Sequence, residues 1–185
     1  MPTLLILSGS PSATSRTAAL SEHLAQRLRG HGHLVTAVRV RDLPADALLS
    51  ADATDPAVAA VVAGIAEADG VVVASPVYKA AYSGVLKTLL DLLPQFALAG
   101  KVVLPVVTGG SPAHVLAIDY ALRPVLSSLG ADHIVPGWFV LDQHIEPNPD
   151  RSDVTLDPRA AEALYPVVDA FSAAVSARRV PATAA

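Results

Sequence analysis

Short apolar segments alternate with longer amphipathic segments along almost the whole of this 185-residue chain. The apolar segments are nearly continuous runs, such as residues 71–74 and 102–107, rather than alternations of apolar and polar residues. Continuous runs are typical of strands that are buried on both faces of a parallel sheet. Strands that alternate with helices indicate an α/β architecture in which helices cover both faces of the sheet.

The order of the segments predicts five strands and five helices. Strands are expected over residues 4–7, 34–40, 71–74, 101–107 and 133–140, and helices over residues 15–29, 56–68, 83–93, 112–129 and 158–177. Residues 41–55 are expected to form a long connection with room for a short helical turn, and residues 146–157 a loop. No repeat or long linker divides the chain. We therefore expect one domain over residues 1–178 and a disordered tail over residues 179–185.

The composition excludes several classes of function. The chain has no cysteine, which excludes disulfide scaffolds, cysteine-ligated metal sites and thiol redox catalysis. No metal site is predicted. The formal net charge of −4 argues against nucleic-acid binding, which would need a basic patch.

The apolar content is high, with a mean hydropathy of +0.46. No apolar run approaches the roughly 20 residues of a membrane-spanning helix, and the first residues lack the charged start of a signal peptide. We therefore expect a cytoplasmic protein that does not bind membranes. Its surplus apolar residues are expected in a doubly covered sheet or a subunit interface.

Ligands of such folds bind outside the carboxyl ends of the strands, so three loops are candidates: residues 8–17, 75–84 and 108–114. The first loop is rich in hydroxyl groups and carries one cation, Arg16, where a helix is expected to begin. Backbone N–H groups, hydroxyl groups and the helix dipole together favour an anion such as phosphate. The loop matches neither the P-loop nor the dinucleotide-binding pattern. A serine-rich turn capped by Ser15 is the alternative.

The second loop suits a flat ring. Tyr78 and Tyr82 lie among small residues, along which a heteroaromatic ring could lie, although packed tyrosines are the commoner case. In the following helix, Lys87 and Asp91 are four residues apart and are expected to form a surface ion pair of small energetic value. A pair between subunits is the alternative.

The third loop contains two adjacent glycines. The N–H groups of Gly109 and Gly110 can face a developing negative charge, although an ordinary strand-to-helix turn explains the glycines equally well. His114 lies one turn into the next expected helix, and we assign it no catalytic role.

A proline interrupts the helix expected over residues 112–129. Pro124 has no N–H group, so the carbonyl of Tyr120, four residues back, loses its helical hydrogen bond. We therefore expect a kink or a π-bulge at Tyr120, and π-bulges are frequent at functional sites. A kinked packing helix with Tyr120 in a core or interface is the alternative.

The three loops together match a known pattern in order and identity. The matching residues are Gly9-Ser10-Pro11, Ser15-Arg16-Thr17, Pro76-Val77-Tyr78-Lys79, Tyr82-Ser83-Gly84, Lys87, Asp91 and Thr108-Gly109-Gly110-Ser111. This set resembles the NADPH-dependent FMN reductases of flavodoxin-like fold. Within them it is most similar to the reductase component of two-component alkanesulfonate monooxygenase systems. The resemblance extends over residues 3–138.

The resemblance implies a doubly wound sheet of five parallel strands in the order 2-1-3-4-5, with FMN and NADPH as cofactors. It implies that the FMN phosphate is held by Ser10, Ser15, Arg16 and Thr17, that the isoalloxazine ring is lined by Pro76, Val77 and Tyr78, and that the pyrimidine edge meets Thr108, Gly109, Gly110 and Ser111. Tyr120 matches a tyrosine that forms a π-helix at a tetramer interface near the flavin. A homotetramer or homodimer is therefore implied.

The implied reaction needs little from side chains. Hydride passes from NADPH to FMN, and no general acid or base is required. Reduced FMN would leave the protein or pass to an FMNH₂-dependent monooxygenase in sulfonate sulfur assimilation. Ser12 departs from the family pattern, in which arginine often follows the Gly-Ser-Pro turn, and so removes one positive charge from the phosphate site.

Two other functions stay open. One is a quinone or azo reductase of the same fold with permanently bound FMN. The other is a flavodoxin-like electron carrier, although such carriers are usually more acidic than −4. A phospho-acceptor receiver domain is disfavoured, because Ser8-Gly9 and Ser75-Pro76 stand where it needs acidic residues.

Overall fold

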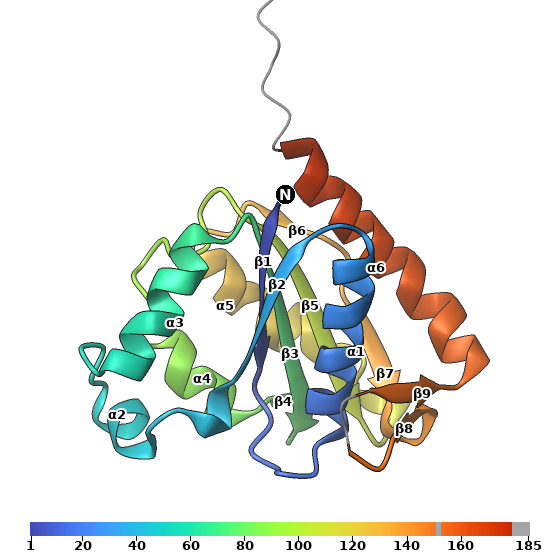
Figure 1. Cartoon of the computed structure of the whole chain (residues 1–185). Coiled ribbons are helices and arrows are strands. Elements are labelled where there is room, and N and C mark those ends of the chain that lie inside the picture. The colour runs from blue at the N-terminus through green and yellow to red at the C-terminus, as the bar shows by residue number, and fades with distance from the viewer. Residues whose placement is uncertain (151–152, 179–185) are drawn as a thin grey trace, which may run out of the picture.

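The computed structural model describes residues 1–150 and 153–178. Its centre is a sheet in which β2, β1, β3, β5 and β6 lie in that order with all neighbours parallel, and β7 pairs with β5 beyond β6 (Figure 1). The strands of this sheet are β1 (Thr3–Ser8), β2 (Leu34–Arg39), β3 (Gly70–Tyr78), β5 (Val102–Gly109), β6 (His133–Ile134) and β7 (Trp138–Leu141). The predicted order 2-1-3-4-5 is confirmed, since β5 is the fourth expected strand and β6 with β7 form the fifth.

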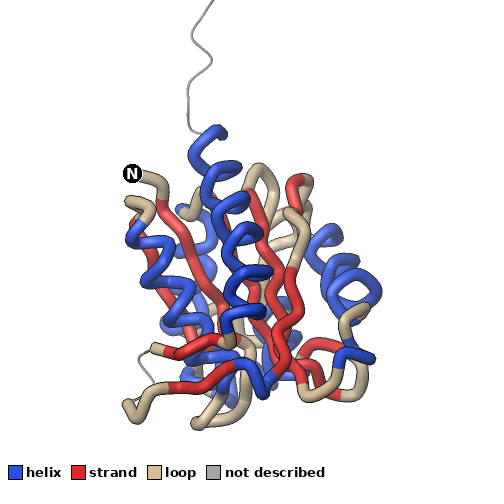
Figure 2. Tube along the Cα trace, turned by 90° about the vertical axis from the view of Figure 1, so that its right-hand side faces the viewer, coloured by secondary structure: helices blue, strands red, loops and turns tan. Residues whose placement is uncertain are grey.

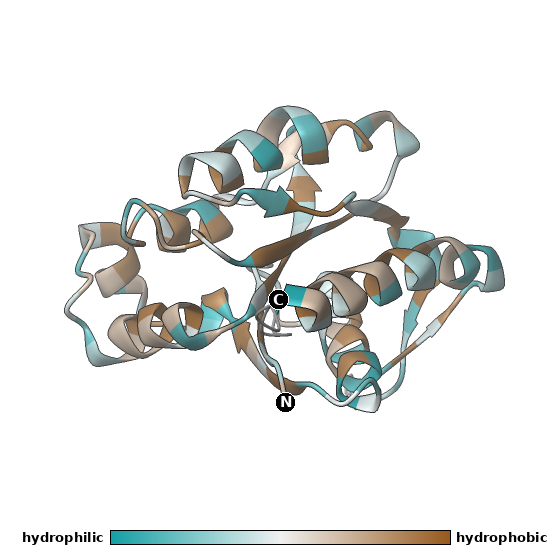
Figure 3. Ribbon diagram, turned by 90° about the horizontal axis from the view of Figure 1, so that it is seen from above, coloured by the Kyte–Doolittle hydropathy of each residue, from teal (hydrophilic) through white to brown (hydrophobic). Residues whose placement is uncertain are grey.

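Helices cover both faces of this sheet (Figures 1 and 2). One face carries α1 (Arg16–Gly30) and α6 (Pro158–Arg178). The other carries α3 (Pro56–Glu67), α4 (Gly84–Leu90) and α5 (Arg123–Ser128), with the short α2 (Ala45–Ser50) beside them. Seen from above, the mostly hydrophobic strands lie between the two helical layers (Figure 3). None of the helices in the described residues combines the length and apolar composition needed to cross a bilayer.

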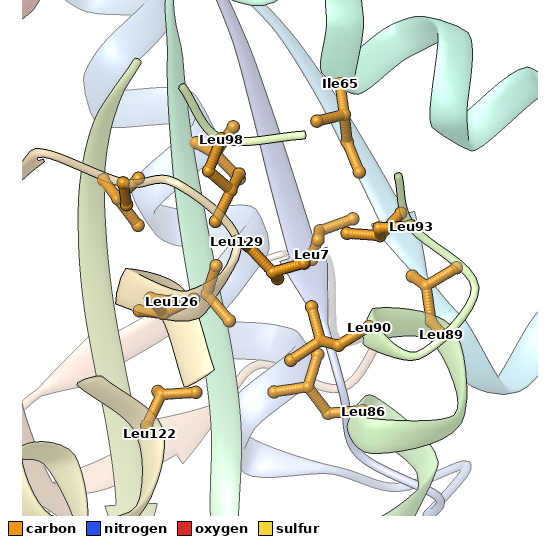
Figure 4. Packing of buried hydrophobic residues seen from close by; sticks show 14 of the residues in the cluster. Leu7, Ile65, Leu86, Leu89, Leu90, Leu93, Leu98, Leu122, Leu126 and Leu129 are labelled. Carbon is orange, nitrogen blue, oxygen red and sulfur yellow. The ribbon is translucent and has the colours of Figure 1, made fainter. Parts of the chain in front are cut away.

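Successive residues of β1 point into two different cores. Leu5 and Leu7 pack with α3 and α4, where Leu7 lies beside Leu86 and Leu90 (Figure 4). Leu4, in turn, packs with α1 and α6. Burying one such side chain contributes roughly 1.5–3 kcal/mol. Both faces of the strand are therefore fixed, and the loop at its carboxyl end is held at one place in the fold.

The structure corrects the expected boundaries after β3. The strand was expected to stop at Ala74, but it continues to Tyr78 and returns through an antiparallel strand β4 (Ala81–Tyr82). Lys79 and Ala80 connect the two with φ values of 51° and 65°, as in a two-residue type I′ hairpin turn. The sequence has no glycine or asparagine there, so nothing in it predicts this turn. The helix that follows ends at Leu90, three residues earlier than predicted.

Two other expectations are corrected nearer the C-terminus. The strand expected over residues 133–140 is split into β6 and β7 by Pro136 and Gly137. Proline has no N–H group and so cannot donate a hydrogen bond to the neighbouring strand. The loop expected over residues 146–157 contains an antiparallel hairpin of β8 (Ile145–Pro147) and β9 (Val154–Leu156). The expected disordered tail, residues 179–185, lies outside the described residues.

Candidate functional site

The first two candidate loops are hydrogen-bonded to each other at the carboxyl ends of β1 and β3. The Gly9 N–H donates to the carbonyl of Ala74 at 2.8 Å. In the reverse direction, the Ser83 hydroxyl donates to the Gly9 carbonyl, and the same hydroxyl accepts from the Leu86 N–H at 3.1 Å as the N-cap of α4. A Cβ on Gly9 would lie 2.5 Å from the Cβ of Leu86, so only glycine allows α4 to pack this closely.

The first and third loops are joined by a buried contact between two hydroxyl groups. The Oγ1 atoms of Thr17, in the first turn of α1, and Thr108, at the end of β5, lie 2.7 Å apart. Both residues are only 1% exposed. This contact fixes the N-terminus of α1 against the end of β5.

The joined loops enclose a cavity of about 280 Å³, close to the lower end of the range of roughly 300–1,000 Å³ for small-molecule sites. Nine of the eleven residues predicted to bind cofactor line it: Ser10, Ser15, Arg16, Thr17, Pro76, Val77, Tyr78, Thr108 and Gly109. The other two lie outside this lining. Gly110 is exposed, and the Ser111 hydroxyl accepts from the Ala113 N–H at 3.2 Å.

One end of the cavity is suited to an anion. The Ser15 hydroxyl caps α1 by accepting from the Ala18 N–H at 3.1 Å. The N–H groups of Arg16 and Thr17 belong to the same first turn, whose donors have no partner within the helix and lie at the positive end of its dipole. The Arg16 side chain extends to the β8 segment, where its Nε donates to the Ile145 carbonyl at 3.2 Å.

The other end of the cavity is apolar and bordered by tyrosine. Pro76 and Val77 are buried, whereas Tyr78 is 48% exposed. Tyr82 is half-buried, and burial raises the pKa of its phenol. It lies outside the cavity lining, as a member of the core between the sheet and α4.

The expected ion pair on α4 is present and lies within the chain. The Lys87 Nζ is 2.6 Å from Asp91 Oδ1, and this hydrogen bond raises the pKa of Lys87. Both side chains are more than 40% exposed, so the pair has the small energetic value expected of a surface contact.

Three further residues line the cavity: Ser12, Thr14 and Asp142. Ser12 and Thr14 belong to the first loop and were not assigned individually. Asp142 begins the short 3₁₀ turn Asp142–His144 directly after β7. The sequence did carry a signal for it, because a polar residue at the carboxyl end of the fifth strand is placed like those of the other strands.

The helix expected over residues 112–129 is interrupted where Pro124 predicts it. It consists of a 3₁₀ turn (Pro112–His114), a π-helix (Ile118–Leu122) and α5. The Arg123 N–H donates to the carbonyl of Ile118, five residues back, which is the π-helical spacing. Tyr120 lies in this π-helix and is 79% exposed.

The donor set fits FMN. Hydroxyl groups, the first turn of α1 and one guanidinium suit a phosphate. The apolar wall of Pro76, Val77 and Tyr78 suits a flat ring. Among these lining residues only Arg16 and Asp142 carry a full charge, so the pocket can hold and orient a cofactor but offers little acid–base chemistry of its own.

The comparisons with known proteins agree with this chemistry. Residues 2–146 match the family described as NADPH-dependent FMN reductase. The FMN reductase (NADPH) of Pseudomonas putida strain KT2440 is 45% identical over 175 residues, which are 95% of this chain and 89% of the relative. The FMN reductase (NADPH) of Escherichia coli K12 is 48% identical over 149 residues, 78% of each chain.

A solved structure supports the same assignment. The apo form of the NADH:FMN oxidoreductase EMOB superimposes with a TM-score of 0.87 at 40% identity, and covers 99% of this chain and 94% of its own. A family match over most of the chain, relatives at this identity and a cavity built from the expected residues lead to one assignment. The chain belongs to the NADPH-dependent FMN reductase family, whose members use FMN and a reduced nicotinamide nucleotide.

Proposed function

We propose that FMN is a substrate of this reductase rather than a permanently bound group, and that reduced FMN passes to a partner monooxygenase in sulfonate sulfur assimilation. The observation that supports this is the weakly charged cavity. Its phosphate end contains one guanidinium and otherwise neutral hydroxyl groups. Ser12 stands where the family resemblance leads us to expect a second cation. Neutral donors hold a phosphate less strongly than charged ones, which suits a ligand that must leave.

The proposal gives a role to nine of the lining residues, and to Gly110 and Ser111 next to them. Ser10, Ser15, Arg16 and Thr17 bind the phosphate, and Pro76, Val77 and Tyr78 form the wall along the ring. Thr108, Gly109, Gly110 and Ser111 meet the pyrimidine edge, where N–H groups stabilise negative charge. When bound, the flavin supplies the redox chemistry by accepting a hydride from the nicotinamide nucleotide. The residues around it orient the two rings and exclude unproductive geometries.

We propose that the π-helix forms a subunit interface next to the site, in a homotetramer or homodimer. Tyr120, in the π-helix, is 79% exposed, and Val115 and Leu116, just before the π-helix, are 48% and 56% exposed. Next to them is a second cavity of about 230 Å³, lined in part by Ile118, Trp138 and Phe139. Apolar side chains gathered in this way favour contact with another protein surface. Tyr120 of one subunit would then influence flavin transfer in its neighbour. A cytoplasmic location stays a prediction.

Two assays test the proposal. Steady-state turnover is measured with NADPH and NADH against FMN, FAD and a quinone, and we expect free FMN to be the preferred acceptor. In an anaerobic stopped-flow experiment, the reduced complex is mixed with a flavin-binding protein that changes absorbance on taking up reduced FMN. We expect transfer at a rate at least equal to turnover. Turnover of quinone without free FMN, or reduced FMN that never leaves, would instead favour a reductase with permanently bound flavin.

A further inference from the structure

Asp142 is the acidic side chain of the cavity lining, and the family resemblance gives it no role. It follows Leu141, which is paired in register with Gly109 across β7 and β5. Asp142 is therefore placed one residue beyond that pair, on the side of the cavity formed by the end of β5. This is the side where the proposed function places the pyrimidine edge of the flavin.

The backbone holds this segment on both sides. The Ile145 N–H donates to the carbonyl of Asp142 and closes the 3₁₀ turn. The Ile145 carbonyl accepts from Arg16 Nε at 3.2 Å, which ties the turn to the start of α1. The position of Asp142 thus does not depend on its own side chain.

The Asp142 carboxylate has no ion pair or hydrogen bond to another side chain or N–H group within residues 1–150 and 153–178. It is only half-buried, so water can reach its charge, and no cation among the described residues contacts it directly. A carboxylate that served only to orient Arg16 would be expected to contact its guanidinium, and Arg16 instead donates to the Ile145 carbonyl.

The charges of the lining cancel. Arg16 contributes one positive charge and Asp142 one negative charge, and the remaining lining residues are neutral. A phosphate monoester carries about −1.5 to −2 at neutral pH, and reduction of the flavin adds negative charge on the ring. A carboxylate in the same cavity therefore disfavours both forms of FMN and disfavours the reduced form more.

We propose that Asp142 is a specificity-determining residue that makes the site bind reduced FMN less tightly, relative to oxidised FMN, than a neutral residue would. This rests on the proposed function, in which reduced FMN is the product that leaves. A like charge within one cavity changes a binding constant by roughly three- to thirtyfold at the effective dielectric constant near a protein surface. Asp142 acts by charge alone and so promotes product release.

The test compares the wild type with Asp142→Asn and Asp142→Glu. Dissociation constants are measured by ultrafiltration for oxidised FMN in air and for dithionite-reduced FMN under anaerobic conditions. In Asp142→Asn we expect the constant for oxidised FMN to fall about threefold and that for reduced FMN about tenfold. Asp142→Glu keeps the charge and should preserve the wild-type ratio. The difference should shrink at ~0.5 M salt, where charges are screened.

The matched control is Asp132→Asn, which removes the same charge just before β6, at the opposite end of the sheet, where Asp132 pairs with Arg178 at 3.0 Å. It should leave both constants unchanged. Weaker binding of either form by Asp142→Asn would show that the carboxylate accepts a hydrogen bond from the flavin, and an equal change in both forms would show no discrimination. Either result overturns the proposal. Failure of the proposed function is seen separately, as a wild type that never releases reduced FMN.

Discussion

Replacing Thr17 by valine removes one of the two hydroxyl groups that join α1 to the end of β5. Thr17 and Thr108 are both 1% exposed, and their Oγ1 atoms are 2.7 Å apart. Valine has almost the same shape as threonine, so the packing around the position is kept. The hydroxyl group left behind on Thr108 then lacks this hydrogen-bond partner at a position that is 1% exposed.

The expected magnitude follows from that burial. A buried hydroxyl group without a partner costs about 1–3 kcal/mol, whereas the net contribution of one neutral hydrogen bond is about 1 kcal/mol. Thr17→Val and Thr108→Val should therefore each lower the free energy of unfolding by about 1–3 kcal/mol. The double variant leaves no orphaned hydroxyl group, so its cost should be smaller than the sum of the single costs by about 1–2 kcal/mol.

The assay is urea denaturation of the four proteins without FMN, followed by tryptophan fluorescence and circular dichroism. Coincident transitions by the two probes justify two-state analysis. Thr36→Val, at an exposed position of β2, is the matched control and should change the stability by no more than about 0.5 kcal/mol. Additive single effects would refute the argument, because they would mean that the two hydroxyl groups do not depend on each other.

Three further outcomes are expected. Tyr120→Ala should leave the unfolding free energy of the monomer unchanged, since the side chain is 79% exposed. It should shift sedimentation towards smaller species and change the rate of FMN release. An unchanged oligomeric state would show that the π-helix is not part of the proposed interface. Arg16→Gln should weaken FMN binding roughly tenfold by loss of a charged phosphate donor, while Arg29→Gln, at the other end of α1, should not. His33 lies 2.7 Å from the Ser172 hydroxyl, and burial lowers the pKa of its imidazole below 6.5. The unfolded chain therefore takes up this proton more readily than the folded chain. The stability that neutral His33 contributes is present above pH 6.5 and is lost as the pH falls through the lower folded-state pKa. Urea titrations of the wild type and His33→Asn across this pH range should give unfolding free energies that differ in their slope against pH, and equal slopes would contradict this expectation.

The parts of the fold that the sequence predicted correctly have strong local causes. The continuous apolar runs require strands with both faces covered, and that alone leads to helices on both sides. Pro124 has no N–H group, so the carbonyl of Tyr120 cannot receive its α-helical hydrogen bond, whatever the helix propensity of the neighbouring residues. Arg16 and Thr17 line the cavity, but their expected role came from the family resemblance, because the loop alone was also compatible with a serine-rich turn capped by Ser15.

The parts that were missed depend on tertiary contacts. Lys79 and Ala80 adopt positive φ values that neither residue type favours. The sequence therefore predicts a loop where the structure has the β3–β4 hairpin. The place of Asp142 just after the fifth strand could be read from the sequence, but whether it reaches this cavity depends on the register in which β7 pairs with β5, which a single sequence does not reveal. The split of the fifth strand at Pro136 and Gly137 was visible as two residues that disfavour strands, but its position in the sheet was not.

The hydrogen bond from Arg16 to the Ile145 carbonyl joins residues 129 positions apart, and this separation sets the order in which the site is assembled during synthesis. When a ribosome has released the chain only as far as residue 114, all three candidate loops have been made, yet the wall that contains Asp142 and Ile145 has not. The nascent protein at that stage has an open phosphate loop with an unrestrained guanidinium. Flavin capture is therefore expected to begin only after β7 has emerged and docked on β5. Stalled nascent chains that end well before and well after residue 145 would differ in FMN retention.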